Sequence, residues 1–170
     1  HHQVSPSFPF DPEAFEYLKS MGATTWKLRD NVRNTPEIVE QIKSHTKIDL
    51  EETVPKGLGG TVNIISVGSK LEEEEIILKE LGSWLRGSSL VKRDDICILT
   101  HDEANVLRLV NFLNTNNLTA EKITKHSITS QRDAIVVATV EDFKGLEKPI
   151  ICIAGLGETD ELTKVRKFIY

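Results

Sequence analysis

The chain has 170 residues, which is enough for one domain with a sizeable buried core and too few for two comfortable ones. The composition has 39% hydrophobic and 28% charged residues, and no apolar run is long enough to span a bilayer. These features predict an intracellular protein, cytoplasmic or nuclear, with no membrane partner. The net charge of -5 argues against a surface coated in basic residues, yet it is compatible with a local groove that binds a nucleic-acid backbone.

The two leading histidines and the Pro- and Phe-containing segment after them are interpreted as a tag remnant and leader over residues 1–10, and residues 11–170 as a single domain. Cys97 and Cys152 each lie in an apolar, strand-like run, as small buried thiols do in a reducing compartment. Neither a disulfide nor a zinc site is favoured, and no metal site is predicted.

In the first part of the domain, residues 24–30 predict a strand. A helix is predicted over 34–45, with Thr35 as its cap and Pro36 at its first helical position. The segment 61–68 (TVNIISVG) predicts a short buried strand.

The segment 71–87 predicts an amphipathic helix with a solvated start at Glu72–Glu75. Its apolar face would comprise Ile76, Ile77, Leu81 and Leu85. The remaining predicted elements are a strand over 94–100, a helix over 101–117, strands over 133–140 and 149–157, and a helix entering a strand over 158–170. This alternation predicts an α/β fold with a parallel sheet covered by helices.

In a parallel sheet, ligand sites collect in the loops that leave the carboxyl ends of strands. Arg33 lies between a predicted strand and a capped helix, where its guanidinium could hold a phosphate; the alternative is a surface ion pair with Glu37 or Asp30. The Gly-rich stretch 56–61 is interpreted as a flexible turn, because it precedes a strand and lacks the Gly-Lys-Ser/Thr ending of a phosphate loop.

A third loop, within "TVEDFKGLEKPIICIAGLG", places Lys144 and Glu147 around Gly145, which allows close backbone approach. His101 and Asp102 are expected to cap the helix that follows them. A free-standing enzyme is disfavoured, because no Ser/His/Asp or Cys/His set falls on the loops that would display it.

Taken in order, these segments resemble the second RecA-like domain, the 2A type, of UvrD/Rep-like superfamily I helicases. "LRDNVRNTPEI" is similar to motif IV, with Val32 in place of the usual aromatic residue, and "VVATVEDFKGLEKPIICIAGL" is similar to motif V. The segment "KVRKFIY" resembles the lead-in to motif VI, before which the chain ends at Tyr170. "VRNTPEIVEQI" and "VEDFKGLEKPI" also resemble the helicase-like half of Schlafen proteins.

The resemblance implies a RecA-like three-layer fold and a role as the second motor domain of an ATP-dependent DNA or RNA helicase or translocase. Arg33 would be catalytic, reaching the γ-phosphate of an ATP held, with Mg, mainly by the N-terminal RecA-like domain of the same protein. Lys144, Gly145 and Glu147 would face the nucleotide, with Glu147 toward the ribose.

The resemblance further implies that Thr139 and Thr100 contact the backbone of single-stranded DNA or RNA. Glu141 stands where the family often has His, and an acidic side chain repels phosphate. The alternative is therefore a degenerate helicase-like domain that acts as a nucleic-acid- or protein-binding regulatory module without motor activity.

The chain contains neither a Gly-x-x-x-x-Gly-Lys-Ser/Thr loop nor a strand ending in an acidic pair for magnesium. We therefore expect the isolated chain not to hydrolyse ATP. A phosphate-release assay with magnesium on successive purification fractions checks this, and turnover that follows the protein through purification contradicts it.

Overall fold

The computed structural model describes residues 11–24, 30–31, 34–46, 54–55, 60–87, 90–124 and 133–155. The chain divides into two compact units, residues 1–65 with 169–170, and residues 66–168.

The first unit begins with helix α1 (Pro12–Ser20), which the sequence reading did not predict. The Asp11 side chain caps it by accepting from the backbone N–H groups of Glu13 at 2.9 Å and Ala14 at 3.1 Å. Aspartate followed by proline is an ordinary helix-start signal, so the sequence did contain the information. None of the α1 side chains is buried.

The rest of this unit contains a capped helix beside a short strand pair. Helix α2 (Pro36–Thr46) confirms the predicted helix, and the Thr35 hydroxyl accepts from the Ile38 N–H at 3.4 Å. Strands β1 (Asp30–Asn31) and β2 (Val54–Pro55) pair in parallel. Only the end of the strand predicted over 24–30 is therefore seen as a strand, with residues 25–29 outside the described part.

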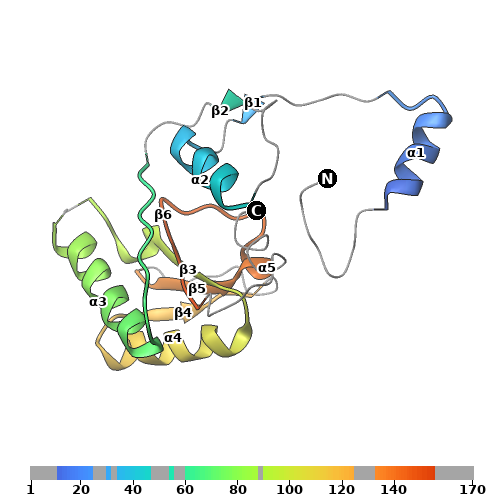
Figure 1. Ribbon diagram of the computed structural model, residues 1–170. Coiled ribbons are helices and arrows are strands. Elements are labelled where there is room, and N and C mark those ends of the chain that lie inside the picture. The colour runs from blue at the N-terminus through green and yellow to red at the C-terminus, as the bar shows by residue number, and fades with distance from the viewer. Residues whose placement is uncertain are drawn as a thin grey trace. The chain divides into compact units, whose positions relative to one another are not determined.

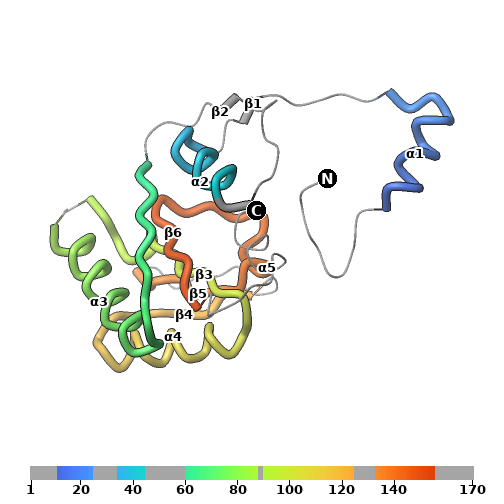
Figure 2. Tube along the Cα trace, viewed as in Figure 1, coloured from blue at the N-terminus to red at the C-terminus, as the bar shows by residue number. Residues whose placement is uncertain are grey.

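Residues 61–67 correct the prediction of a buried strand. They belong to neither a helix nor a strand, and Figure 2 shows them as a plain trace leading into the helix that follows. Their apolar side chains are exposed, Ile64 to 62%. An apolar pattern predicts side-chain preference, but a strand also needs a neighbour whose backbone completes its hydrogen bonds.

The second unit is built on a parallel sheet of four described strands in the order β4-β5-β3-β6. This confirms the α/β class and the parallel sheet. The finer RecA-like identity stays a prediction. The elements predicted over 158–170 also stay predictions, because they lie outside the described residues. The strands are β3 (Ile96–Thr100), β4 (Ala120–Lys122), β5 (Ile135–Thr139) and β6 (Ile150–Ile153).

Helices cover both faces of this sheet, but unequally. Helices α3 (Lys70–Gly87) and α4 (Glu103–Thr115) pack on one face, and the short α5 (Val140–Phe143) contributes Phe143 to the other (Figure 1). A 3-10 turn (Arg93–Asp95) leads into β3.

Helix α3 keeps most of its predicted apolar face. Ile77 and Leu81 are buried and Leu85 packs against them, as expected. Ile76 is half-buried, and Leu78 joins the core cluster in addition. Within the described ranges, no helix combines the length and apolarity needed to cross a bilayer.

Helix α4 offers a matched test of this core, because Leu109 is fully buried and Leu107, two residues earlier, is 51% exposed. We expect Leu109→Ala to lower the free energy of unfolding by about 2–5 kcal/mol, from lost burial and the cavity left behind. Leu107→Ala should change it by less than about 0.5 kcal/mol. Urea titration followed by circular dichroism measures both, and equal losses would argue against this placement of α4.

Candidate functional site

The carboxyl ends of β3 and β5 form the point of the sheet best suited to hold a ligand. From β3 the chain crosses through α4 to β4, whereas from the neighbouring β5 it crosses through α5 to β6, in the opposite direction and on the opposite face. Crossovers of one hand require these opposite faces. The two connections therefore leave adjacent strands toward opposite faces of the sheet, each passing over the other's strand, and parallel sheets bind ligands at such switch points.

The two threonines predicted to contact nucleic acid are brought together at this point. Thr100 and Thr139 are direct partners in the β3–β5 register, each at the last position of its strand. Thr100 is fully buried, and its hydroxyl donates to the Asp102 carbonyl at 2.8 Å. The half-buried Thr139 hydroxyl accepts from the Asp142 N–H at 3.1 Å and donates to its carboxylate at 2.9 Å, capping α5. Both hydroxyls therefore have local structural roles.

The predicted nucleotide contacts lie in the segment between α5 and β6. Lys144 and Glu147 are exposed. Gly145 has φ +92, and no described atom lies within 4 Å of where a Cβ would sit. This backbone is open to the approach of a ligand and would be strained by any side chain. Arg33, the predicted catalytic residue, lies outside the described residues.

The loop after β3 confirms the capping role predicted for Asp102. Its carboxylate accepts from the Asn105 N–H at 2.7 Å, and His101 Nε2 lies 2.7 Å from its second oxygen. Partial desolvation raises the pKa of Asp102, but the Asn105 backbone bond, the His101 charge, the Asn105 side chain and the Ala104 backbone bond together lower it below its ordinary value. The folded protein therefore favours the charged carboxylate.

Sequence reasoning missed a charged cluster that joins the first turn of α3 to α4. Arg108 Nη2 lies 2.7 Å from Glu73 Oε2, and Nη1 contacts Glu74. These two glutamates are only 15% and 17% exposed, so the prediction of a solvated start over Glu72–Glu75 is wrong for them, although Glu72 and Glu75 are exposed. The sequence feature that could have indicated this cluster is the single charge of Arg108 inside the apolar run "VLRLV".

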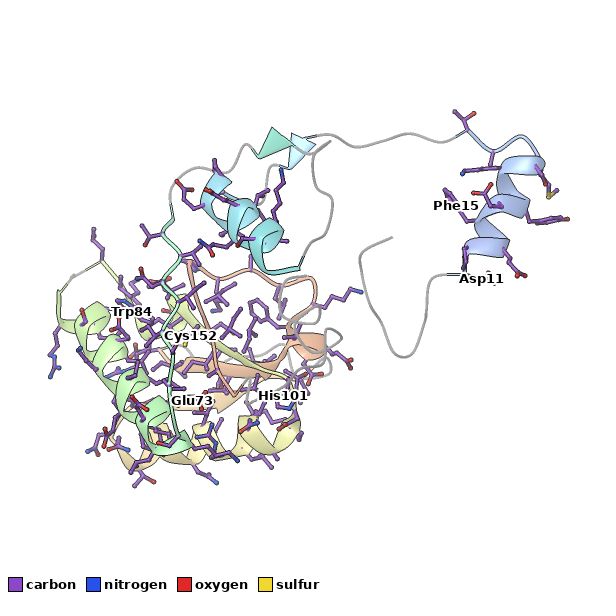
Figure 3. The ribbon with its side chains drawn as sticks, in the orientation of Figure 1. Asp11, Phe15, Glu73, Trp84, His101 and Cys152 are labelled. Atoms are coloured by element: carbon purple, nitrogen blue, oxygen red, sulfur yellow. The ribbon has the colours of Figure 1, made fainter. Side chains whose placement is uncertain are left out.

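The same cluster reaches the end of β6. Glu73 Oε1 accepts from the Gly155 N–H at 2.6 Å, and Gly155 has φ +70. A Cβ at Gly155 would lie 3.0 Å from the Asn105 side chain, so a larger residue would push on it. Asn105 in turn accepts from Arg108 Nε at 3.2 Å. Figure 3 labels Glu73 near the start of α3 and His101 directly before α4.

The two cysteines are buried or half-buried thiols with low reactivity. Cys97 packs in the core on the α5 face, and Cys152, half-buried, packs against the cluster on the α3 and α4 face. Burial raises the pKa of Cys97 to about 12 and that of Cys152 to about 11, so both remain protonated thiols near neutral pH. Among the residues the structure describes, no three His, Cys, Asp or Glu side chains are grouped as metal ligands.

The lowered pKa of Asp102 predicts an acid-dependent contribution to stability. Its folded-state pKa lies below the unfolded value of about 3.9, so its charge-dependent stabilisation is fully present above that pH and disappears as the pH falls through the folded pKa. We expect Asp102→Asn to destabilise the protein at about pH 6, and the gap to close below about pH 4. Denaturant titrations at both pH values measure this; a gap that widens in acid contradicts it.

Comparisons of the chain with protein-family models, with curated proteins and with solved structures found no match.

Proposed function

We propose that this chain is the second motor domain of an ATP-dependent DNA or RNA helicase or translocase of the UvrD/Rep-like type. The proposal rests on the motif resemblance of residues 28–38 and 136–156, together with an all-parallel sheet flanked by helices, which a RecA-like fold shares with other α/β folds. The fold alone hosts many activities, so the motif-bearing segments have to carry the functional part.

The observation that carries the proposal is the course of the segment Thr139–Glu147. It leaves β5 beside the end of β3, where the two crossovers leave toward opposite faces of the sheet, and it includes the open backbone at Gly145. A Lys-Gly-Leu-Glu turn there would present open backbone and two exposed charges of opposite sign to a ligand at this edge. Lys148 donates to the Asp94 carbonyl and anchors the far end of this segment before β6.

In this proposal the chain contributes to a shared nucleotide site. ATP and its magnesium would be held mainly by an N-terminal RecA-like domain, with Lys144, Gly145 and Glu147 closing the cleft from this side. Arg33 would stabilise the charge that develops on the transferred phosphoryl group.

Thr139 and Thr100 are the proposed contacts to the single strand. Because Thr139 is half-buried and its hydroxyl is bonded to the N–H and the carboxylate of Asp142, it would exchange one of these local bonds for a phosphate. Thr100 is fully buried and would require the loop at His101 and Asp102 to move. A contact of this kind reads the backbone and not the base sequence.

The second candidate function is a helicase-like binding module without motor activity. It is favoured by the donation of the Thr139 hydroxyl to the Asp142 carboxylate and by the adjacent Glu141, which put two acidic side chains beside the proposed strand contact. Two carboxylates oppose an approaching phosphate.

The test is ATP hydrolysis by a longer form of the protein that includes the N-terminal domain, with and without single-stranded DNA or RNA. For a motor, we expect strand-stimulated turnover that falls by about 10³-fold or more in Arg33→Ala, because a charge-stabilising arginine typically contributes that much. Arg33→Lys should recover little, since lysine lacks the planar fork. Nucleotide binding should be largely kept.

The control is strand binding by the same preparations. Folded protein that binds a single strand but shows no turnover, with or without Arg33, would favour the binding module. Turnover that Arg33→Ala leaves intact would remove the catalytic role from this arginine and keep the motor.

A further inference from the structure

We propose that Arg108 and Glu73 are positioning residues that couple the loop leaving β3 to the chain leaving β6, so that the two sides of the carboxyl edge respond as one unit. This inference goes beyond the proposed function and does not depend on it.

The first step is the position of Arg108 between three partners. Its guanidinium donates to Asn105 at 3.2 Å, to Glu73 at 2.7 Å and to Glu74. Its side chain is 22% exposed, so these bonds are only partly screened by water. A planar fork can satisfy partners on two helices at once, which fixes α3 and α4 relative to each other.

The second step is that each end of this cluster holds the chain at the end of a strand. Through Glu73 it holds the Gly155 N–H at 2.6 Å, directly after β6. Through Asn105, whose amide donates to Asp102 at 3.1 Å, it holds the loop after β3. Glu73 and Asp102 belong to different elements and are linked through Arg108 and Asn105.

The third step is that Gly155 and Asn105 also touch. With φ +70 and no side chain, Gly155 packs so closely that a Cβ would lie 3.0 Å from Asn105 Cγ and 3.1 Å from Nδ2. The path from Gly155 through Glu73, Arg108 and Asn105 therefore closes on itself. A path closed by three hydrogen bonds and one tight packing contact resists displacement of one member without the others.

The experiment is amide hydrogen exchange, read by NMR, on the 170-residue chain with Glu73→Gln and Glu74→Gln as a matched pair. Each variant removes one charge from the same turn and gives Arg108 a neutral amide in place of a carboxylate, but only Glu73 holds Gly155. In Glu73→Gln we expect the Gly155 amide to exchange about tenfold faster, because glutamine has one neutral acceptor oxygen where Glu73 uses two charged ones, for Gly155 and for Arg108. Glu74→Gln should leave Gly155 near its wild-type rate.

Coupling is tested at the opposite end of the network. Glu73→Gln should also speed exchange at the backbone N–H of Asn105, which donates to the Asp102 carboxylate. Asp102→Asn should speed exchange at the backbone N–H of Gly155. Amides at the centre of β3 should stay unchanged in every variant and report that the sheet is intact. Arg108→Lys, which keeps the charge but loses the fork, should speed exchange at both Gly155 and Asn105.

Two results would overturn the proposal. One is a Gly155 amide that responds equally to Glu73→Gln and Glu74→Gln, which would mean that general charge and not the specific bond matters. The other is an Asn105 amide that keeps its wild-type rate in Glu73→Gln and Arg108→Lys, which would mean that the two loops are held independently.

Discussion

The second unit depends on the parallel pairing of β3 with β5 on one side and β6 on the other. All five residues of β3 are buried, so its backbone groups need partners on both sides, and the two ladders supply them. Its side chains alternate between two cores: Ile96 and Ile98 face α3 and α4, whereas Cys97 and Leu99 face Phe143. Once this strand is central, helices have to bury both faces of the sheet, and with crossovers of one hand the direction of each crossover decides which face its helix covers.

Where the ladders stop, at the carboxyl edge, polar groups have to be satisfied by other means. Thr100 donates to the Asp102 carbonyl, Asp102 caps α4, and the Gly155 N–H finds the carboxylate of Glu73. A partly buried carboxylate of this kind is costly without a counter-charge, and Arg108 provides it. The charged cluster is thus a consequence of ending two neighbouring strands at an edge that the α3 and α4 helices partly cover.

The same edge connects the fold to the proposed activity. A switch point is where parallel sheets bind ligands in general, and this supports a binding role without naming the ligand. The identity of the ligand rests on the resemblance of the Lys-Gly-Leu-Glu turn to motif V. The surroundings of Thr139 give evidence for and against a phosphate contact. Its hydroxyl lies at the carboxyl edge of the sheet, but it bonds to Asp142 and is close in sequence to Glu141. Motor and binding module therefore differ in whether a phosphate can displace one of these bonds.

The sequence by itself determined the features that depend on interactions between residues close together in the chain. Helix starts at Thr35 and Asp102, the amphipathic α3, the apolar strands and the α/β class all follow from caps and periodicity, which act within a few residues. The tertiary structure alone decided the strand order, the pairing of Thr100 with Thr139, and the ion pairs of Arg108 with glutamates 34 and 35 positions away. It also decided that residues 61–67, apolar enough for a strand, are not one in the described chain. The physical reason is the same in each case: a pattern fixes which side chains prefer burial, whereas partners for backbone and charge come from segments far apart in sequence.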